Sequence, residues 1–200
     1  MQTLGRRERK KQAVRERIHE ETIRLIEQVG IDSVTIDLVC EQADIARKTF
    51  YNYYSSRQEL LIEICQSRLL FHTEMVINAA MAESNSLEEQ LTLVFSWFKN
   101  NFATANQLQR DLIVFMISNF STNRSQTEGQ LLFMNNCFLK LYEQHNDRLL
   151  AGLSPQFCAE ITVGLINGIS MNWLSDQNYD ITGRMDQIVE YLMGSLVKDT

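Results

Sequence analysis

The sequence predicts an all-α protein of about nine helices, with three helices in a small head and the rest in a larger body. The 200 residues include one proline and eight glycines, so long helices can run uninterrupted. Apolar residues recur every three or four positions, and no segment alternates as strands do. Apolar residues make up 44% of the chain, enough for a core, and no run approaches the ~20 apolar residues that span a membrane.

Two helices are expected before residue 44. The first covers about 6–29, because apolar residues share one face along it and Gly30 can end it. Thr35 has the side chain of a helix cap. It precedes a second helix, in which the apolar residues between 36 and 43 fall on one face.

A tight turn, a third helix and a long fourth helix follow. Asp44 is expected in the turn, because aspartate enters the left-handed backbone region at modest cost. The third helix covers about 46–53. Ser56 with Glu59 forms a capping box for a fourth helix that continues to about residue 82.

Five further helices are expected, and several begin at a recognisable cap. Ser86 with Glu89 forms a second capping box, and Ser154 precedes a proline at the first helical position. The expected ranges are 86–105, 108–120, 128–150, 155–175 and 184–197.

Charge is distributed unevenly along the chain. Residues 1–57 hold 11 basic and 9 acidic side chains, a net charge of +2, whereas residues 58–200 hold 8 and 16, a net charge of −8. Seven of the basic residues lie within 6–17. A basic end on an acidic body is typical of a protein that binds a polyanion at one end.

The third helix carries residues that can contact DNA. Ala46 and Phe50 share an apolar face that can pack on the second helix. Basic, aromatic and amide side chains share another face, namely Arg47, Lys48, Tyr51 and Asn52. Arginine or lysine can donate to guanine, and asparagine can pair with adenine. Thr35 and Arg57 begin helices and are candidates for phosphate contacts. The alternative is an amphipathic helix pair with a solvated polar face.

Residues 30–61 resemble the N-terminal domain of TetR-family repressors. The resemblance lies in Gly30, Thr35, Val39, Ala43, Ile45, Thr49, Phe50, Tyr51, Tyr54, Leu60 and Leu61. It implies a three-helix DNA-binding head, residues 1–57, on a six-helix body, residues 58–200, that dimerises and often holds a small-molecule effector. By position, the residues facing DNA would be Thr35, Arg47, Lys48, Thr49, Tyr51, Tyr53 and Arg57.

Five residues depart from the family pattern within this segment. Asp44 replaces glycine, Ala46 replaces a capping serine, Lys48 replaces a small residue, Tyr54 replaces phenylalanine and Arg57 replaces lysine. The loss of the serine removes a helix cap, and the side chain of Asp44 is a candidate to replace it.

The last two expected helices are candidates for a dimer interface. The eighth helix is apolar on several sides, and two of its glycines, four residues apart, let another backbone approach. The ninth helix has one apolar stripe. The candidate interface residues are Phe157, Ile161, Gly164, Leu165, Gly168, Ile188, Leu192 and Leu196. The alternative is that these residues complete the core of a single chain.

Aromatic and methionine residues are frequent in the middle of the chain. They suit the wall of an apolar effector cavity, although they suit a packed core equally. The candidate pocket residues are Trp97, Phe115, Met116, Phe133, Met134, Phe138, Met171 and Trp173. The candidate polar anchors are Asn135, Asn136, Asn167 and Asn172.

Other classes of function have little support in the sequence. Glu16 and His19 have the spacing of a metal-ligand pair, but no second pair accompanies them. No catalytic motif is present, so we expect no enzyme activity, cofactor or metal. The four cysteines form no CxxC pair and are expected to be buried, reduced thiols, as in a cytoplasmic protein.

The sequence therefore predicts a bacterial, cytoplasmic transcription regulator, most simply a repressor. It would bind a palindromic double-stranded operator as a homodimer and respond to an apolar or amphipathic effector. One alternative is a ligand-independent DNA-binding structural or cell-division factor. The other is an all-α enzyme or metal-binding bundle.

Overall fold

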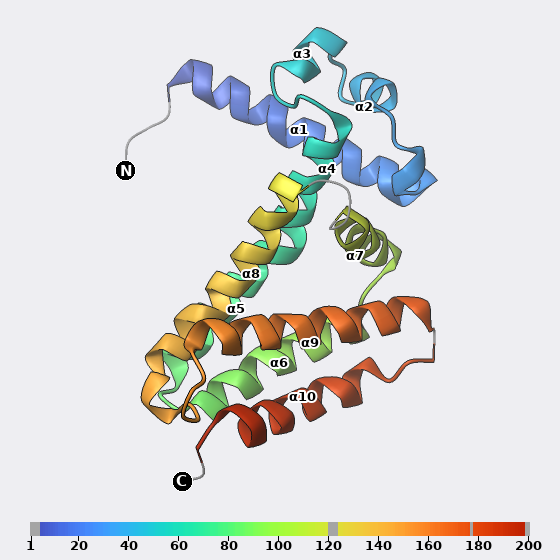
Figure 1. Cartoon of the computed structure of the whole chain (residues 1–200). Coiled ribbons are helices and arrows are strands. Elements are labelled where there is room, and N and C mark those ends of the chain that lie inside the picture. The colour runs from blue at the N-terminus through green and yellow to red at the C-terminus, as the bar shows by residue number, and fades with distance from the viewer. Residues whose placement is uncertain (1–4, 120–123, 177, 199–200) are drawn as a thin grey trace. The chain divides into compact units, whose positions relative to one another are not determined.

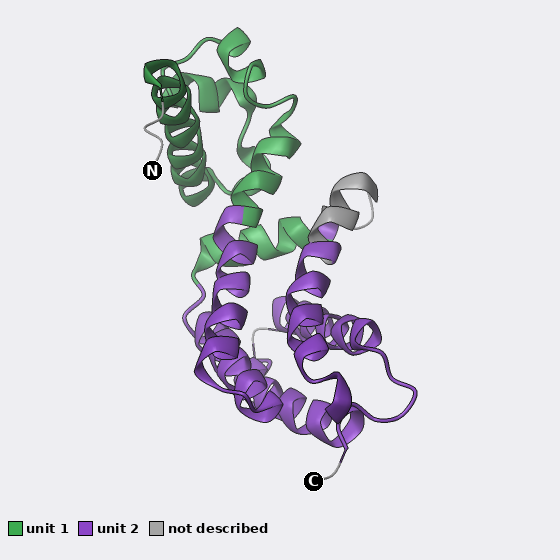
Figure 2. Cartoon of the chain, turned by 90° about the vertical axis from the view of Figure 1, so that its left-hand side faces the viewer, with its two compact units in different colours: residues 1–66, 106–117 green, residues 67–105, 118–200 purple. Residues whose placement is uncertain are grey.

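The computed structural model describes residues 5–119, 124–176 and 178–198, and these residues are helical almost throughout (Figure 1). The chain divides into two compact units (Figure 2). The first contains residues 1–66 and 106–117, and the second contains residues 67–105 and 118–200. The all-α prediction is confirmed, and the described residues form no β-sheet.

The first unit is built from a long helix and several shorter ones. Its elements are α1 (Arg6–Val29), the 3₁₀ turn η1 (Ile31–Ser33), α2 (Ile36–Gln42), α3 (Arg47–Tyr51), α4 (Arg57–Cys65) and α7 (Gln107–Asn119). Ile18 and Ile26 of α1 are buried, as are Leu60 and Leu61 of α4. These side chains form one core, so α4 completes the small unit that the sequence assigned to residues 1–57.

The expected helix caps are present in this unit. The hydroxyl of Thr35 accepts a hydrogen bond from the backbone N–H of Leu38, at 3.3 Å. The hydroxyl of Ser56 accepts from the N–H of Glu59, at 3.1 Å. The Glu59 carboxylate accepts from the N–H of Ser55 rather than from that of Ser56. This shifts the reciprocal half of the expected capping box by one residue.

The expected fourth helix, 56–82, is interrupted in the structure. After α4, a π-helical turn covers Gln66–Leu70, and α5 covers Phe71–Glu83. A π-turn has one more residue per hydrogen-bonded loop than an α-helix, so it shifts the faces of the residues that follow it. The apolar spacing does not reveal this insertion. With this interrupted helix counted as one, the described residues contain nine helices, as expected.

The second unit is a ring of five helices. They are α5, α6 (Leu87–Ala103), α8 (Arg124–Gln144), α9 (Pro155–Ser175) and α10 (Ile181–Leu196). Each packs on two others, in the order α5, α6, α10, α9, α8 and back to α5. Figure 1 shows α6, α9 and α10 side by side. The short 3₁₀ turn η3 (Asn146–Arg148) follows α8, and a bridge joins Leu149 to Val197 at the end of α10.

Two pairs of buried polar side chains join helices of the ring. The His145 Nε2 lies 2.9 Å from the side-chain oxygen of Gln90, and the hydroxyls of Tyr142 and Thr162 lie 2.7 Å apart. Burial lowers the pKa of His145 and raises that of Tyr142. These pairs join α6 to the end of α8, and α8 to α9, in specific registers.

Several helix boundaries differ from those expected. The structure begins α8 at Arg124, four residues before the expected start at 128, and residues 120–123 lie outside the described residues. It begins α10 at Ile181 because the Asp180 carboxylate accepts a hydrogen bond from the N–H of Gly183, at 2.9 Å. An aspartate cap therefore starts this helix three residues before the expected start at 184.

The four cysteines are free and buried, as expected. Burial raises the pKa of the Cys65 thiol to about 12 and that of Cys137 to about 11, so both are protonated at neutral pH. Among the described residues, no helix is long and apolar enough to cross a membrane.

Candidate nucleic-acid interface

The pair α2 and α3 is held by a tight turn. Asp44 adopts a φ of +48°, the left-handed conformation expected for it. The N–H of Ile45 donates to the carbonyl oxygen of Cys40 at 3.0 Å, which closes the turn. The described contacts give the Asp44 side chain no role as a cap, and Ala46, the N-cap of α3, provides none. The turn is therefore held by the backbone and by packing.

Aromatic packing fixes the orientation of α3. Phe50 is fully buried, and its ring centroid lies 5.7 Å from that of Tyr54 and 5.6 Å from that of Tyr51. Because Phe50 occupies the inner face of this short helix, Arg47, Lys48 and Tyr51 remain on the outside, and all three are exposed. These three side chains form the outer face of α3.

Arg47 on this outer face is held by a carboxylate of α2. Its Nη2 donates to the Asp37 Oδ2 at 2.6 Å, and its Nε makes a second contact with the other carboxylate oxygen. Such a two-point pair orients a guanidinium, but both residues are exposed, so water screens it. Asp37 was not among the residues expected to matter. Its position on α2, the helix that precedes Arg47, is the only sequence feature that could have suggested this ion pair.

Arg57 is engaged by the backbone of its own unit. Its Nε donates to the carbonyl oxygen of Val34 at 2.5 Å, and its Nη2 donates to that of Ile31. These bonds tie the start of α4 to the segment before α2. Arg57 thus braces the unit, and its expected phosphate contact stays a prediction. The same holds for Thr35, whose hydroxyl caps α2.

Three other predicted residues, one on α3 and two in the turn after it, lie on the side toward α1. Thr49, Asn52 and Tyr53 line a groove whose other wall belongs to the first half of α1. The sequence had placed Asn52 with Arg47, Lys48 and Tyr51. The structure corrects this, because α3 ends at Tyr51 and Asn52 lies in the turn that follows.

A polar network joins α1 to α4 behind this interface. The Tyr54 hydroxyl lies 2.9 Å from His19 Nε2 and 3.1 Å from Glu63 Oε1. His19 Nε2 and Arg15 Nε both lie 2.8 Å from Glu63 Oε1. The structure thus gives His19 protein partners, and the described residues contain no cluster of three or more potential ligands able to hold a metal.

Burial and charge oppose each other in this network. Burial disfavours the ionised form of Glu63, but the hydrogen bond from Arg15 and the charges of His19 and Arg15 outweigh it and lower the pKa of Glu63. Burial and the charge of Glu63 raise the pKa of Tyr54. Tyr54 was the only signal of this network in the sequence, because it departs from the family's phenylalanine.

The residues proposed for an effector pocket have mixed environments. Phe115 and Met116 belong to the first unit, and the other six belong to the second. Phe138 is fully buried, and Trp173 packs edge-on against Phe102 at 5.1 Å, as core residues do. Met171 has 53% of its surface exposed. Trp97, Phe133 and Met134 are half-buried.

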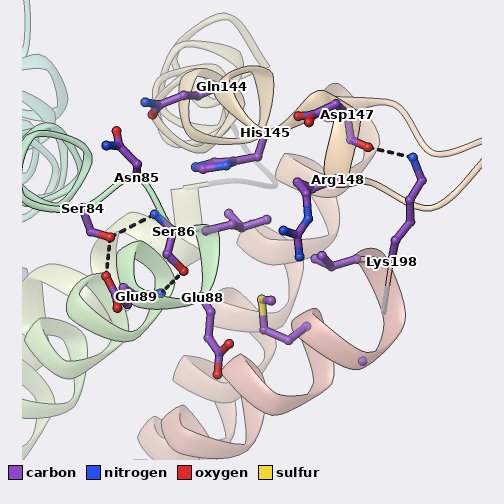
Figure 3. Close-up of a pocket in the computed structure, with 14 residues that line it drawn as sticks. Ser84, Asn85, Ser86, Glu88, Glu89, Gln144, His145, Asp147, Arg148 and Lys198 are labelled. Carbon is purple, nitrogen blue, oxygen red and sulfur yellow. Dashed lines mark hydrogen bonds between the residues drawn. The ribbon is translucent and has the colours of Figure 1, made fainter. Parts of the chain in front are cut away.

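A large hollow in the second unit has a different character. It measures about 1170 Å³ and is lined mainly by polar residues, including Gln144, His145, Asp147 and Arg148 (Figure 3). None of the eight proposed pocket residues lines this hollow or the groove beside α1. The predicted aromatic pocket therefore remains a prediction.

One proposed polar anchor has an unusual environment. The side-chain oxygen of Asn135, on α8, is buried and has no hydrogen-bond partner among the described residues. A buried acceptor without a donor is costly, by about 1–3 kcal/mol. Phe133, Met134 and Phe138 are its near neighbours on the same helix. An apolar molecule with one donor group would suit this stretch of α8.

The proposed dimer residues separate into two groups. On α9, Phe157, Gly164 and Gly168 are exposed, and a Cβ built on either glycine meets no atom within 4 Å. Ile161 and Leu165 are half-buried. These five residues leave a face of α9 open.

The three residues proposed on α10 lie in the chain's own core. Ile188, Leu192 and Leu196 are 4%, 0% and 5% exposed, and α10 packs on α6. Their stripe is therefore used within one chain, which corrects their assignment to the surface of an interface. A clean apolar stripe shows that a helix face is buried, but it does not show against what.

Comparison with known proteins supports the assignment of the first unit. Residues 18–64 match the family model described as bacterial regulatory proteins, tetR family. This range covers the second half of α1, the α2–α3 pair and almost all of α4. No curated protein matches the chain.

Solved structures share the fold of the whole chain. FadR of Thermus thermophilus, a TetR-family transcriptional repressor in complex with lauroyl-CoA, has a TM-score of 0.76 at 18% identity and covers 93% of this chain and 97% of its own. SmeT, the repressor of the Stenotrophomonas maltophilia multidrug efflux pump SmeDEF, has a TM-score of 0.73 at 14% identity. The match covers 92% of this chain and 91% of SmeT. FadR of Bacillus halodurans, a fatty acid degradation regulator, has a TM-score of 0.69 at 19% identity. The match covers 90% of this chain and 98% of that protein's chain.

Proposed function

We propose that this chain, which carries the N-terminal domain of the TetR family at residues 18–64, is a transcriptional repressor that binds a palindromic operator as a homodimer and responds to a small apolar or amphipathic molecule. The observation that carries the proposal is the α2–α3 pair. A buried Phe50 and a left-handed Asp44 hold α3 so that Arg47, Lys48 and Tyr51 face outward.

This outer face has the chemistry of a major-groove reader. Arg47 and Lys48 can donate to guanine O6 and N7, and Tyr51 offers a ring and a hydroxyl. Because α3 lies on the surface of a small unit, it can enter a groove without rearrangement of the core. We assign the choice of sequence to these residues.

A homodimer would form through the open face of α9. Phe157 and Ile161 offer apolar surface at one end of this face, and Gly164 and Gly168 allow a second helix to approach closely. A two-fold pair would place two α3 helices at successive major grooves, about 34 Å apart or a multiple of that distance. The operator would then be a palindrome.

The effector would bind within the second unit beside α8. Two of the similar structures contain an apolar or amphipathic molecule, namely lauroyl-CoA in the Thermus FadR complex and triclosan in a SmeT complex. In this chain, the unpaired acceptor of Asn135 lies on the same helix as Phe133, Met134 and Phe138. An effector that prefers one arrangement of the dimer would change operator affinity by that preference.

The experiment starts with selection of DNA by the full chain from a random duplex library. The proposal expects a two-fold symmetric sequence, bound by two chains, with affinity that falls steeply as salt rises. If no preferred sequence were recovered, the proposed role as a transcriptional regulator would be wrong. If one chain bound a non-palindromic site, the proposed homodimer would be wrong.

The effector is tested with lauroyl-CoA and triclosan as probes. Either should raise the melting temperature and change affinity for the selected operator, and Asn135→Leu should reduce the response while leaving operator binding of the free protein intact. A symmetric operator with no response to these or to a broad compound screen would favour the ligand-independent alternative.

A further inference from the structure

The large hollow of the second unit is bounded by three segments that are far apart in the sequence. The turn from α5 to α6 with the first turn of α6 forms one wall, the end of α8 with η3 forms another, and the end of α10 forms the third (Figure 3). Leu87, Met193 and Val197 contribute apolar surface, and most of the other lining residues are polar. Apolar surface with a few convergent polar groups is the usual composition of a small-molecule site.

Hydrogen bonds hold these walls in place. The Lys198 Nζ donates to the carbonyl oxygen of Asp147 at 2.7 Å, and the Lys198 N–H donates to that of Arg148 at 2.9 Å. These two bonds tie the end of α10 to η3. The Gln90 Nε2 donates to the carbonyl oxygen of Ser84 at 2.6 Å, which ties α6 to the turn before it. The hollow therefore has a defined shape before any ligand binds.

His145 presents one ring nitrogen to this hollow as a hydrogen-bond acceptor. The residue is only 7% exposed, and its Nε2 lies 2.9 Å from the Gln90 Oε1. Because the amide nitrogen of Gln90 donates to Ser84, its oxygen faces His145, so the Nε2 carries the ring proton. Burial lowers the pKa of His145 and outweighs the opposing charge of Asp147, so the ring is neutral at neutral pH and the Nδ1 keeps its lone pair.

The Nδ1 of His145 has no donor among the described residues. Within that part of the chain, the Asn135 Oδ1 is the only fully enclosed side-chain nitrogen or oxygen atom that lacks a partner. The Nδ1 is therefore open to the hollow that His145 lines. A ligand with an N–H group can reach this acceptor and satisfy it, which favours binding because an unpaired acceptor in a largely buried residue is costly.

Charges of both signs surround the hollow. Glu88 lies on the first turn of α6, Asp147 and Arg148 lie on η3, and all three are exposed. Their side chains form no ion pair or hydrogen bond with any residue that the structure describes, whereas Lys99 and Asp186 of the same unit are paired. Figure 3 shows the Arg148 side chain extending into the space between η3 and the first turn of α6. A ligand in this hollow would meet both carboxylates and a guanidinium.

We infer that this hollow binds a small zwitterion, namely a free amino acid or a short peptide. The ammonium group of the ligand donates to the His145 Nδ1, and Glu88 and Asp147 stabilise its charge. The carboxylate pairs with Arg148, whose planar guanidinium suits two carboxylate oxygens. A wholly cationic ligand would be repelled by the guanidinium, and a wholly anionic one by the two carboxylates.

This site is separate from the one proposed for an apolar effector. The hollow shares no residue with the stretch of α8 around Asn135. Its volume of about 1170 Å³ leaves room for the side chain of an amino acid or for a second residue. Binding here requires neither DNA nor a dimer, so the inference does not depend on the proposed function.

The experiment measures binding of the common L-amino acids and a set of dipeptides to the full chain by calorimetry and thermal melting. At least one of these probes should bind with one molecule per chain and raise the melting temperature. Two analogues of the tightest probe then test its charges. The C-terminal amide lacks the carboxylate and the N-acetyl form lacks the ammonium group, and each should bind at least about tenfold more weakly.

Gly194→Leu tests the place of binding by filling part of the hollow. Gly194 lines it, and a Cβ built there meets no atom within 4 Å, so the variant should remain folded. It should bind the probe at least about tenfold more weakly. The control is Gln187→Leu, at an exposed position of the same helix that does not line the hollow, and it should bind as the wild type does. Equal affinity of the two variants would place the ligand elsewhere and overturn the inference.

Arg148→Gln tests the partner of the carboxylate. It should weaken binding by about fivefold, a moderate loss because Arg148 is exposed and water screens its pairs. Arg184→Gln removes an exposed arginine of α10 outside the hollow and should have no effect. Equal losses in the two variants would show that only net charge matters, which would overturn the assigned contact.

Nitrogen NMR spectroscopy of the wild-type chain reports the contact with His145 directly. The probe should shift the Nδ1 resonance of His145 and leave that of His72, which is exposed and does not line the hollow. An unchanged His145 resonance at saturating probe, or a folded wild-type chain that binds no amino acid or dipeptide, would overturn the inference. Neither result bears on operator binding, and loss of operator binding would leave this site unaffected.

Discussion

At the scale of single residues, the first unit uses its charges in two ways. Some are tied into the fold, as Arg57 is to the carbonyl oxygens of Val34 and Ile31. Others are held at the surface, as Arg47 is by Asp37. A charged side chain in a DNA-binding segment is therefore not by that fact a DNA contact. Its partners in the folded unit decide whether it is free to reach a phosphate or a base.

Arg47→Ala should reduce operator affinity and relax base preference at one position, by about 1–3 kcal/mol if the lost contact is bidentate. Asp37→Asn should keep Arg47 in place but weaken its orientation, so it should reduce base preference less. Competition binding with operators that carry single base changes measures both effects. Equal losses of Arg47→Ala on operator and random DNA would contradict the base-reading role.

Tyr54→Phe should destabilise the first unit by about 1 kcal/mol, because its hydroxyl contacts His19 and Glu63 within a buried site. Phenylalanine is the residue of the family pattern, so the fold should persist. Urea unfolding of the full chain measures the change, with Tyr51→Phe on the exposed face as the control. If the two variants were equally stable, the network would have no measurable effect on stability.

The lowered pKa of Glu63 predicts a pH dependence of stability. A carboxyl group whose pKa is lower in the folded than in the unfolded state stabilises the fold above its unfolded pKa. This stability is lost as pH falls through the folded pKa. Wild-type stability should therefore fall between about pH 5 and pH 3 more steeply than that of Glu63→Gln. Parallel curves from chemical unfolding would contradict this role of Glu63.

At the scale of elements, α9 and α10 show how one apolar pattern serves two purposes. The stripe of α10 is buried against α6, whereas part of α9 stays open to solvent. A helix that is apolar on several sides has surface left over after its own chain has packed. This remaining surface of α9 is the one that we propose for a second copy of the chain.

Gly168→Leu should abolish the proposed dimer but leave the chain folded, because a Cβ built at this exposed position meets no atom within 4 Å and a leucine there would block a close approach. Leu192→Glu should instead unfold the second unit, since it places a charge in a fully buried site. Light scattering and thermal melting separate the two outcomes. A folded Gly168→Leu variant that remains dimeric would show that the dimer interface does not lie on this face of α9.

At the scale of the whole molecule, the compact units differ from the functional division proposed from the sequence. The sequence predicted a boundary at residue 57 between recognition and body, whereas the first compact unit includes α4 and most of α7. The Cys65 thiol donates to the carbonyl oxygen of Leu112 at 3.6 Å, so α7 packs on α4 within this unit. The chain thus returns to its first unit after entering the second.

A fragment of residues 1–57 should therefore not fold cooperatively by itself. It lacks Leu60, Leu61 and Ile64, which are at most 1% exposed in the full chain and complete the core around Ile18 and Phe50. Loss of these side chains removes several kcal/mol of apolar burial. Circular dichroism should show partial helicity with a broad thermal transition. A sharp transition near that of the full chain would show that α4 is dispensable.

The sequence by itself determined the features that depend on local chemistry. Periodicity gave the helices, Thr35, Ser56 and Ser154 gave caps, and Asp44 gave the left-handed turn, because each acts through its own backbone and nearest neighbours. The order of residues from Gly30 to Leu61 was enough to predict the match of residues 18–64 to the tetR family model.

Only the tertiary structure decided which partner each residue meets. It turned Asn52 toward α1, tied Arg57 to the backbone, buried Leu192 against α6 and joined Tyr54 to His19 and Glu63. These outcomes depend on contacts between segments far apart in the chain, which periodicity does not encode. A pattern along one helix fixes which face is apolar or charged, but the packing of other helices fixes whether that face meets core, solvent or a ligand.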